Sequence, residues 1–260
     1  MIRIVQLTDL HLTLPSFQEH RRYDPHFSGG SLLPRVADVV TRATEEKADL
    51  IAVTGDLLDI PAELLDAGTG SGVPNATLDL LAREAGEAYL EVRTILRKAG
   101  LPVLVLPGNH DHPAAFGSVF GSGGRELEIA GFRILAFWDA ERPDHVPERI
   151  GSERRRFEEA LTDPGPMPQI HFQHFPINPV DNRDYPHNYR DRELMTTKLA
   201  AAGKVVLAAG GHYHPGTPLV REGDCALTVC PTFCHPPRPW RLYTITKKRV
   251  GMEEYHAATP

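Results

Sequence analysis

The feature that most constrains the fold is a pattern that occurs five times: a short β-rich apolar run that ends directly in a polar cluster. The clusters are Thr8-Asp9-Leu10-His11, Thr54-Gly55-Asp56, Gly108-Asn109-His110-Asp111, His174-Phe175-Pro176 and Gly211-His212-Tyr213-His214. Helical patterns separate several of the runs, which is the element order of an α/β protein. Because ligands of such proteins bind beyond the carboxyl ends of the strands, we expect the clusters to converge at one edge.

Apolar spacing predicts the helices between the strands. Val36, Val39, Val40 and Ala43 fall on one helical face, and a second amphipathic series runs from Leu78 to Ile95. Further elements are expected as helices over 153–161 and from Asp191, a hairpin that pivots on Gly131, and mostly β-structure over 218–255.

Length and composition are those of a globular protein with one large core. The chain has 260 residues, of which 41% are hydrophobic, and a chain of this size buries roughly 70–75% of its unfolded surface. We see no internal repeat or linker, so the sequence predicts a single domain over residues 1–260. The longest apolar stretches, such as Leu101–Leu106, are too short to cross a bilayer. With no signal-peptide pattern at the start, we expect a cytoplasmic protein without a membrane partner.

Charge and cysteine content exclude further classes. The chain holds 28 Lys and Arg against 34 Asp and Glu, a net charge of −6, and its basic clusters are short and scattered. A nucleic-acid polymer is therefore not expected as a partner, and a small-molecule substrate is. Cys225, Cys230 and Cys234 form no disulfide framework and are expected as small buried hydrophobic residues. The oligomeric state is left open, a homo-oligomer included.

The residue types in the polar clusters point to a metal site. Residues at i and i+2 of an extended chain point to the same side, so Asp9 with His11, and His212 with His214, can each present two ligands to one place. A glycine precedes several of the polar residues, where the chain must turn with little bulk. Imidazole together with carboxylate suits Mn, Fe or Zn, whereas an all-oxygen set suits Mg or Ca. The sequence therefore predicts a transition-metal centre.

These motifs, in this order, resemble the calcineurin-like metallophosphoesterase superfamily over about residues 2–215. The resemblance implies an α/β fold: a four-layer α/β/β/α sandwich of two mixed β-sheets flanked by helices, with a dinuclear site at the strand ends. It also implies two divalent transition-metal ions, Mn and/or Fe, with Zn as a further candidate. One ion would be held by Asp9, His11, Asp56 and His214, and the other by Asp56, Asn109, His174 and His212.

The same resemblance implies catalytic roles. A metal-bridging hydroxide would attack the phosphorus, and His110 would donate a proton to the leaving alkoxide or stabilise its charge. Asp111 would orient His110. Asn109, His110 and His212 would contact the substrate.

Within the superfamily, the compact chain looks most similar to the class III cyclic-nucleotide phosphodiesterases and glycerophosphodiesterases. We therefore expect hydrolysis of small-molecule phosphodiesters. Alternatives on the same site are a phosphomonoesterase and a nucleotide or sugar pyrophosphatase. A non-catalytic binding module is the alternative from another class.

Several assignments have rivals. His171 competes with His174 for one ligand position. The resemblance favours His174, because members of the superfamily place a proline two residues after the ligand, as Pro176 stands here. His112 touches the substrate or, as we favour, lies at the surface. Asp59 is expected as a helix-start carboxylate or as a carboxylate behind the ligands, with a ligand role as the alternative.

Two loops rich in Arg and Tyr are candidates for the pocket rim, with solvated loops as the alternative. Their residues are Arg21, Arg22, Tyr23, Asn182, Arg183, Tyr185, His187, Tyr189 and Arg190. The proline-rich segment Cys230–Pro239 is a candidate for another wall. His20, His26, His145 and His256 are expected as ordinary core or surface residues, and the role of segment 61–74 is left open.

Overall fold

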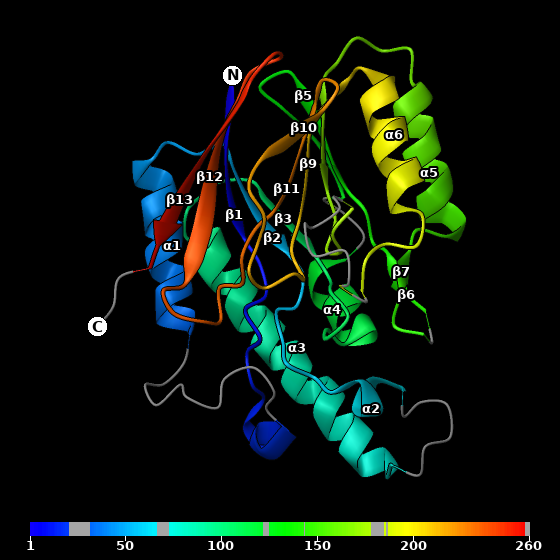
Figure 1. The fold of residues 1–260 in the computed structure, drawn as a ribbon. Helices are drawn as coiled ribbons and strands as arrows, with labels where there is room; N and C mark the ends of the chain where they lie inside the picture. Colours follow the sequence, from blue (N-terminus) through cyan, green and yellow to red (C-terminus); the bar gives the residue numbers. More distant parts are fainter. Residues whose placement is uncertain are drawn as a thin grey trace.

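Two large β-sheets that pack face to face form the centre of the molecule (Figure 1). The structure is a computed structural model that describes residues 1–20, 32–66, 73–121, 125–142, 144–177, 185 and 187–257. Among these residues, the first sheet has the strand order β13 (Val250–His256), β12 (Pro239–Ile245), β1 (Ile2–Leu7), β2 (Leu50–Thr54) and β3 (Val103–Leu106). Strands β1, β2 and β3 are parallel, with Val5 opposite Ile51 and Ala52 opposite Leu104, so their carboxyl ends share one edge.

The second sheet is also mixed. Its described strands follow the order β10 (Val220–Glu222), β11 (Cys225–Val229), β9 (Val205–Gly210), β8 (Gln169–Phe172), β5 (Phe132–Ala136) and β4 (Glu126–Ile129). The central strands β11, β9, β8 and β5 are parallel, and β10 and β4 are antiparallel edges. A small hairpin, β6 (Ala140–Glu141) and β7 (Pro147–Glu148), follows β5 in the chain.

Helices cover the outer face of each sheet and complete four layers (Figure 1). Helices α1 (Leu33–Glu45) and α3 (Asn75–Arg97) pack on the first sheet, and α5 (Gly151–Thr162) and α6 (Arg192–Ala202) pack on the second. Strand β2 shows how the sequence specifies the layers, because alternate side chains point to opposite faces. Leu50 and Ala52 enter the core between the sheets, whereas Ile51 and Val53 face the helices.

The predicted fold class is confirmed: the molecule is a four-layer α/β/β/α sandwich of two mixed sheets. The helix over 78–95 lies within α3, the helix over 153–161 lies within α5, and Asp191 is the N-cap of α6. The sequence did not predict the short helices α2 (Ala62–Leu65), α4 (Pro113–Phe120) and the 3₁₀ helix Pro15–His20, or the hairpin β6–β7. No helix among the described residues combines the length and apolar character needed to span a membrane. The single-domain organisation over 1–260 stays a prediction.

Candidate metal centre

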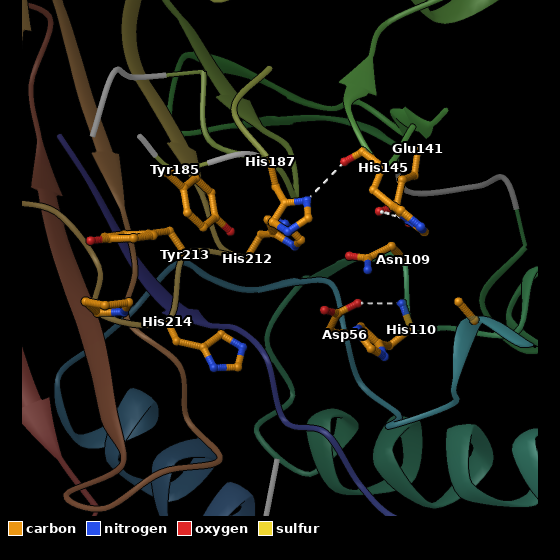
Figure 2. A pocket seen from close by; sticks show the side chains of 12 residues that line it. Asp56, Asn109, His110, Glu141, His145, Tyr185, His187, His212, Tyr213 and His214 are labelled. Carbon is orange, nitrogen blue, oxygen red and sulfur yellow. Dashed lines mark hydrogen bonds and ion pairs between the residues drawn. The ribbon is translucent and has the colours of Figure 1, made fainter. Parts of the chain in front are cut away.

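The predicted polar clusters lie at the carboxyl ends of β1, β2, β3, β8 and β9, from both sheets. Gln6 helps to hold the two sheets together there, because its side-chain amide donates to Thr54 Oγ1 (2.8 Å) and to the carbonyl of Gly210 (2.9 Å). Figure 2 shows side chains of several clusters around one cavity, with Asp56 and Asn109 on one side and His212 and His214 on the other. The fold therefore brings clusters that are far apart in the sequence to one place.

Several of the predicted ligands occupy the left-handed backbone region. The φ angles are 53° at Asp9, 44° at His11, 50° at Asp56 and 66° at His212. Non-glycine residues adopt this region rarely and at a cost of order 1–3 kcal/mol each, and such residues cluster at functional sites. Their occurrence together at the strand ends indicates a site where side-chain direction is imposed by the surrounding structure.

Two glycines allow the clusters to approach one another. A Cβ atom on Gly108 would lie 2.1 Å from Oδ1 of Asp56, and one on Gly211 would lie 1.9 Å from Oγ1 of Thr8. Both distances are far shorter than any contact, so a larger residue would displace the polar clusters. The predicted reason for these glycines is confirmed.

Three side chains converge on Nε2 of His174. Asp56 Oδ2, Asn109 Oδ1 and His212 Nδ1 each lie 3.2 Å from this nitrogen. The other ring nitrogen, Nδ1, donates to the carbonyl of Thr54 at 2.7 Å, so the neutral ring has its lone pair on Nε2. Ligands bound to one ion at about 2.1 Å lie about 3.0–3.4 Å from each other. The spacing of this group is that of a metal ligand set.

A second group contains Asp9, His11 and His214. The Nε2 atoms of His11 and His214 are 3.2 Å apart, and Oδ1 of Asp9 is 3.8 Å from each of them. Oδ2 of Asp9 accepts from the Thr8 hydroxyl (2.6 Å) and from the backbone N–H of His212 (3.0 Å), which fixes the carboxylate. The remaining oxygen, Oδ1, is buried without a hydrogen-bond partner among the described residues. A buried carboxylate oxygen left in this way fits a bound cation.

Asp56 joins the two groups. Its Oδ2 lies 3.2 Å from His174 Nε2 and 3.7 Å from His11 Nε2, while its Oδ1 accepts from the backbone N–H of His110 at 2.8 Å. One oxygen therefore faces both ligand groups. The seven predicted metal ligands are all brought together, and the arrangement fits two divalent ions with Asp56 between them.

Three ligand histidines, two of them in the second group, are kept neutral. Burial lowers the pKa of His11 well below its usual range and lowers the pKa of His214 to about 4. Burial also lowers the pKa of His212 well below its usual range. Neutral imidazoles have the lone pair that a metal ion requires.

His174 itself instead favours a positive charge. Burial lowers the pKa of His174, but the carboxylates of Asp56 and Asp9 outweigh this and raise the pKa to about 10. Burial raises the pKa of Asp56, and His174 and its neighbours bring it well below its usual value. Burial raises the pKa of Asp9 to about 7, aided by the charge of Asp56 and opposed by His174. The metal-free site thus holds a proton where the ligand atoms converge, and a divalent cation can replace it.

His110 lines the cavity but contacts a carboxylate other than the one we expected. Its Nδ1 lies 3.1 Å from the carbonyl of Ile60, and because a carbonyl only accepts, Nδ1 carries the hydrogen. Oδ1 of Asp59 is 3.8 Å from this nitrogen and 3.9 Å from Nδ1 of His11. Asp59 is buried behind both rings and does not begin a helix, so the view of it as a carboxylate behind the ligands agrees with the structure.

Asp111 stabilises the loops, and none of its hydrogen bonds within the described part of the chain reaches the His110 ring. Its carboxylate accepts from the N–H groups of Leu57, Leu58 and Gly108, at 2.8–3.2 Å, and from the Tyr89 hydroxyl at 2.9 Å. The prediction that Asp111 orients His110 is therefore corrected. The physical reason is that a buried carboxylate needs donors on every side, and the backbone turns after β2 and β3 supply them.

Two rival histidines are accounted for elsewhere. His171 points into the core, where its Nε2 lies 2.9 Å from Oε1 of Gln169 and its ring packs against Phe137, so His174 holds the ligand position. His112 caps α4, because its Nδ1 accepts from the N–H of Ala115 at 3.2 Å.

A cavity of about 470 Å³ opens in front of the ligand groups (Figure 2). Its walls are formed by Asp56, Ala62, Asn109, His110, Glu141, His145, Tyr185, His187, His212, Tyr213, His214 and Pro215. Among the predicted rim residues, Tyr185 and His187 line it, whereas Tyr189 is buried in the core and Arg190 pairs with Asp144. Arg21, Arg22, Tyr23, His26, Asn182 and Arg183 lie outside the described residues.

The sequence missed several residues of this cavity, among them Glu141, His145 and Tyr213. Glu141 and His145 come from the hairpin β6–β7, and Tyr213 packs on Tyr185 with ring centroids 5.0 Å apart. The expectation that His145 is an ordinary core or surface residue agrees with its exposed side chain, which also borders the cavity. No local motif marks these positions; Tyr213 alone had a signal, since it stands between His212 and His214.

Comparison with known proteins agrees with this geometry. Residues 2–216 match the family model described as calcineurin-like phosphoesterase. No curated protein sequence matches the chain.

Solved structures share the fold at low sequence identity. A dimetal phosphatase from Danio rerio is 13% identical with a TM-score of 0.65, covering 99% of this chain and 96% of that one. The protein TT1561 of Thermus thermophilus is 14% identical with a TM-score of 0.59, covering 99% of both chains. A purple acid phosphatase from yellow lupin is 13% identical with a TM-score of 0.60, covering 98% of this chain and 51% of that one. At this identity the likeness shows the fold alone.

Proposed function

This chain belongs to the calcineurin-like phosphoesterase family, and on that premise we propose that it hydrolyses small-molecule phosphodiesters with two divalent metal ions. The proposed ligands are Asp9, His11, Asp56 and His214 for one ion and Asp56, Asn109, His174 and His212 for the other. The mixed imidazole and carboxylate set favours Mn or Fe, with Zn as the alternative. Bound divalent ions supply a lowered pKa for a coordinated water and charge stabilisation for the phosphate oxygens.

The observation that carries the choice of a diester is the charge of the cavity. Among its described lining residues there is no Lys or Arg, and Glu141 adds a carboxylate to the wall. A monoester dianion carries one more negative charge than a diester, and arginine forks are a common device for binding phosphate. A diester carries a single negative charge on the phosphate and suits this lining better.

The chain's own residues divide the remaining tasks. Asn109 and His212 lie beside His174 and border the cavity, where we propose that they position the phosphate. In the neutral ring of His110 the hydrogen is on Nδ1, which donates it to the carbonyl of Ile60. A proton for the leaving oxygen is therefore available on Nε2 in the imidazolium form, whose charge the nearby Asp59 carboxylate stabilises. We propose that Nε2 delivers this proton into the cavity that His110 lines.

The size and charge of the cavity also support a small partner. A cavity of about 470 Å³ is within the range of small-molecule sites. Without basic residues in its described lining, it offers no track for a nucleic-acid backbone. We propose that neither a nucleic-acid polymer nor a membrane is the substrate.

The test compares two chromogenic substrates on the manganese-reconstituted protein. We expect a higher kcat/KM for bis(p-nitrophenyl) phosphate than for p-nitrophenyl phosphate, and loss of both activities in Asp56→Ala. Faster cleavage of the monoester would replace the proposal by a phosphomonoesterase. Absence of hydrolysis with Mn, Fe and Zn, together with less than one bound ion per chain, would favour a binding module.

A further inference from the structure

A second cavity lies on the other side of His214. It has a volume of about 400 Å³ and shares His214 and Pro215 with the first cavity. His235 and His256 also line it, and the proline-rich segment 231–239 forms much of its wall. The predicted wall at Cys230–Pro239 therefore exists, but it encloses a separate space. His214 stands between the two cavities.

Three donor side chains meet at this boundary. Ligand atoms of His214, Cys234 and His235 all lie within 4.8 Å of one another, and the two imidazole centroids are 5.5 Å apart. The thiol of Cys234 is buried, with 1% of the residue exposed. His214 also belongs to the group with Asp9 and His11. The same ring is thus in reach of two different ligand sets.

The backbone holds Cys234 in this position. Its N–H donates to the carbonyl of Asp9 at 3.1 Å, and the Thr232 hydroxyl donates to the same carbonyl at 3.0 Å. The N–H of Thr232 donates to the carbonyl of His214 at 3.0 Å. The segment that carries the thiol is therefore attached to the two loops that carry Asp9 and His214. Backbone hydrogen bonds therefore fix the position of the Cys234 thiol.

The donor chemistry of this cluster differs from that of the two-ion site proposed above, called the metal pair here. The ligands of the metal pair are carboxylates, an amide and imidazoles, whereas one thiol and two imidazoles make a softer set. Thiolate and imidazole together suit Zn²⁺ and Cd²⁺ and are poor ligands for Mn²⁺. Cys225 and Cys230 are equally buried but belong to no such group among the described residues.

We propose that His214, Cys234 and His235 form a third metal site, which takes a thiophilic divalent ion and withdraws His214 from the metal pair. On binding, the Cys234 S–H bond is replaced by a sulfur–metal bond, and one proton leaves to solvent without any change of oxidation state. Because His214 serves both ligand sets, excess Zn²⁺ or Cd²⁺ lowers the activity of the manganese-loaded protein. The effect on activity rests on the proposed function, whereas the binding does not.

Cadmium titration of the manganese-loaded protein tests the binding. We expect an ultraviolet thiolate-to-cadmium charge-transfer band in the wild type that is absent in Cys234→Ser and unchanged in Cys225→Ser, the matched control. Loss of an outer-shell partner alone lowers metal affinity by about 10–100-fold, so His235→Gln, which removes a direct ligand, is expected to weaken cadmium binding at least about tenfold. Absence of the band in the wild type, or its survival in Cys234→Ser, would overturn the site.

Phosphodiester hydrolysis measured in the same titration tests the coupling. We expect cadmium to inhibit the wild type and Cys225→Ser at concentrations that leave Cys234→Ser active, while all three are equally active before cadmium is added. Equal inhibition of all three would mean that cadmium acts on the metal pair directly, and would overturn the coupling. If no variant hydrolyses phosphoesters, the proposed function fails and the charge-transfer band alone decides the site.

Discussion

The two sides of the catalytic cavity are held in opposite ways. The metal cradle, defined as Asp9, His11, Asp56, Asn109, His174, His212 and His214, lies on strand ends whose turns are tied together by buried hydrogen bonds. The rim, defined as Glu141, His145, Tyr185, His187 and Tyr213, lies largely on a hairpin and a loop. The cradle combines residues of both sheets, and the rim adds a separate unit beside it.

The contacts that hold the rim are mostly at the surface. Arg190 pairs with Asp144 at 2.6 Å and lies 3.6 Å from Glu148, while His187 Nδ1 contacts the carbonyl of His145 at 3.1 Å. Exposed ion pairs of this kind contribute about 0–1 kcal/mol each. The base of the hairpin is firmer, because Arg149 and Asp139 form a fully buried pair there. The surface part of the rim is therefore held more weakly than the cradle, although Tyr185 and His187 pack against the ring of His212.

This difference predicts that one chemical change has unequal effects on the two sides. Asp56→Asn removes the charge that faces both ligand groups, and a loss of several kcal/mol of charge stabilisation corresponds to about a thousandfold in kcat/KM. Glu141→Gln is the same change on the rim and should leave metal content unaltered. Metal analysis and diester kinetics on both variants make the comparison. Comparable losses in the two would show that the rim belongs to the catalytic machinery.

The cradle's backbone offers the largest expected effect on stability. Asp111→Asn places an amide NH₂ against donors from Leu57, Leu58, Gly108 and Tyr89. Leaving buried donors unsatisfied costs about 1–3 kcal/mol each, so we expect a loss of about 3 kcal/mol or more in urea denaturation. Tyr89→Phe removes one of the four contacts and also the acceptor of the His112 N–H (2.8 Å), so it should cost about 1–2 kcal/mol. If Asp111→Asn lowered the free energy of unfolding by no more than Tyr89→Phe does, the proposal that Asp111 stabilises the loops would be contradicted.

His110 lies where the cradle meets the cavity, and its effect should depend on the leaving group. Loss of general acid catalysis costs about 10²–10⁴-fold, so His110→Ala should lower kcat by about a hundredfold for an alkyl diester. A p-nitrophenyl diester leaves without a proton and should be affected much less. Metal content should not change in this variant. Equal losses with both leaving groups would point to a role in binding or structure.

The cradle could be predicted from the sequence because each of its motifs is local. The turn after a strand places Asp9 or Asp56 within a few residues of a recognisable apolar run, and parallel strands bring those turns to the same edge. His174 could be preferred to His171 because the resembled family places a proline two residues after the ligand, as Pro176 stands here. The structure agrees, since His171 contacts Gln169 in the core whereas His174 reaches the ligand groups.

The rim and the support of the cradle depend on tertiary contacts that no motif records. Asp111 meets Leu57 across a separation of 54 residues, so its part in the loops could not be read from its position next to His110. Glu141 and His145 reach the cavity because a short hairpin folds over it, and their sequence resembles that of any charged surface segment. His112 shows the same limit, because its capping role required knowing that α4 begins at Pro113.

The protonation of the cradle should make metal affinity depend on pH, unlike substrate selection at the rim. In the metal-free protein the carboxylates of Asp56 and Asp9 overcome burial and raise the pKa of His174 to about 10, above its ordinary 6.5. Above pH 7, where Asp9 is ionised, Mn²⁺ must displace this one proton, so its affinity should rise about tenfold per pH unit while one proton is released. Calorimetry in buffers of different ionisation enthalpy measures both quantities.

The same shift predicts the stability of the metal-free protein. A raised histidine pKa contributes stability that is complete below pH 6.5 and is lost as the pH rises toward 10. Stabilisation by Mn²⁺, measured as the rise in Tm, should therefore increase over this range. An affinity for Mn²⁺ that does not change with pH would contradict the protonated cradle.

The smallest expected effect concerns substrate choice at the rim. Glu141→Gln removes a negative charge from the cavity wall, and a charge several ångströms from a phosphate near a protein surface contributes about 0.5–1 kcal/mol. The ratio of monoester to diester kcat/KM should therefore rise about two- to fivefold, and less at high ionic strength, where the charge is screened. Glu148→Gln on the partner strand of the same hairpin is the control, because Glu148 does not line the cavity. An equal change of the ratio in both variants would assign the effect to hairpin stability. An unchanged ratio in Glu141→Gln would mean that the charge of Glu141 does not favour the diester.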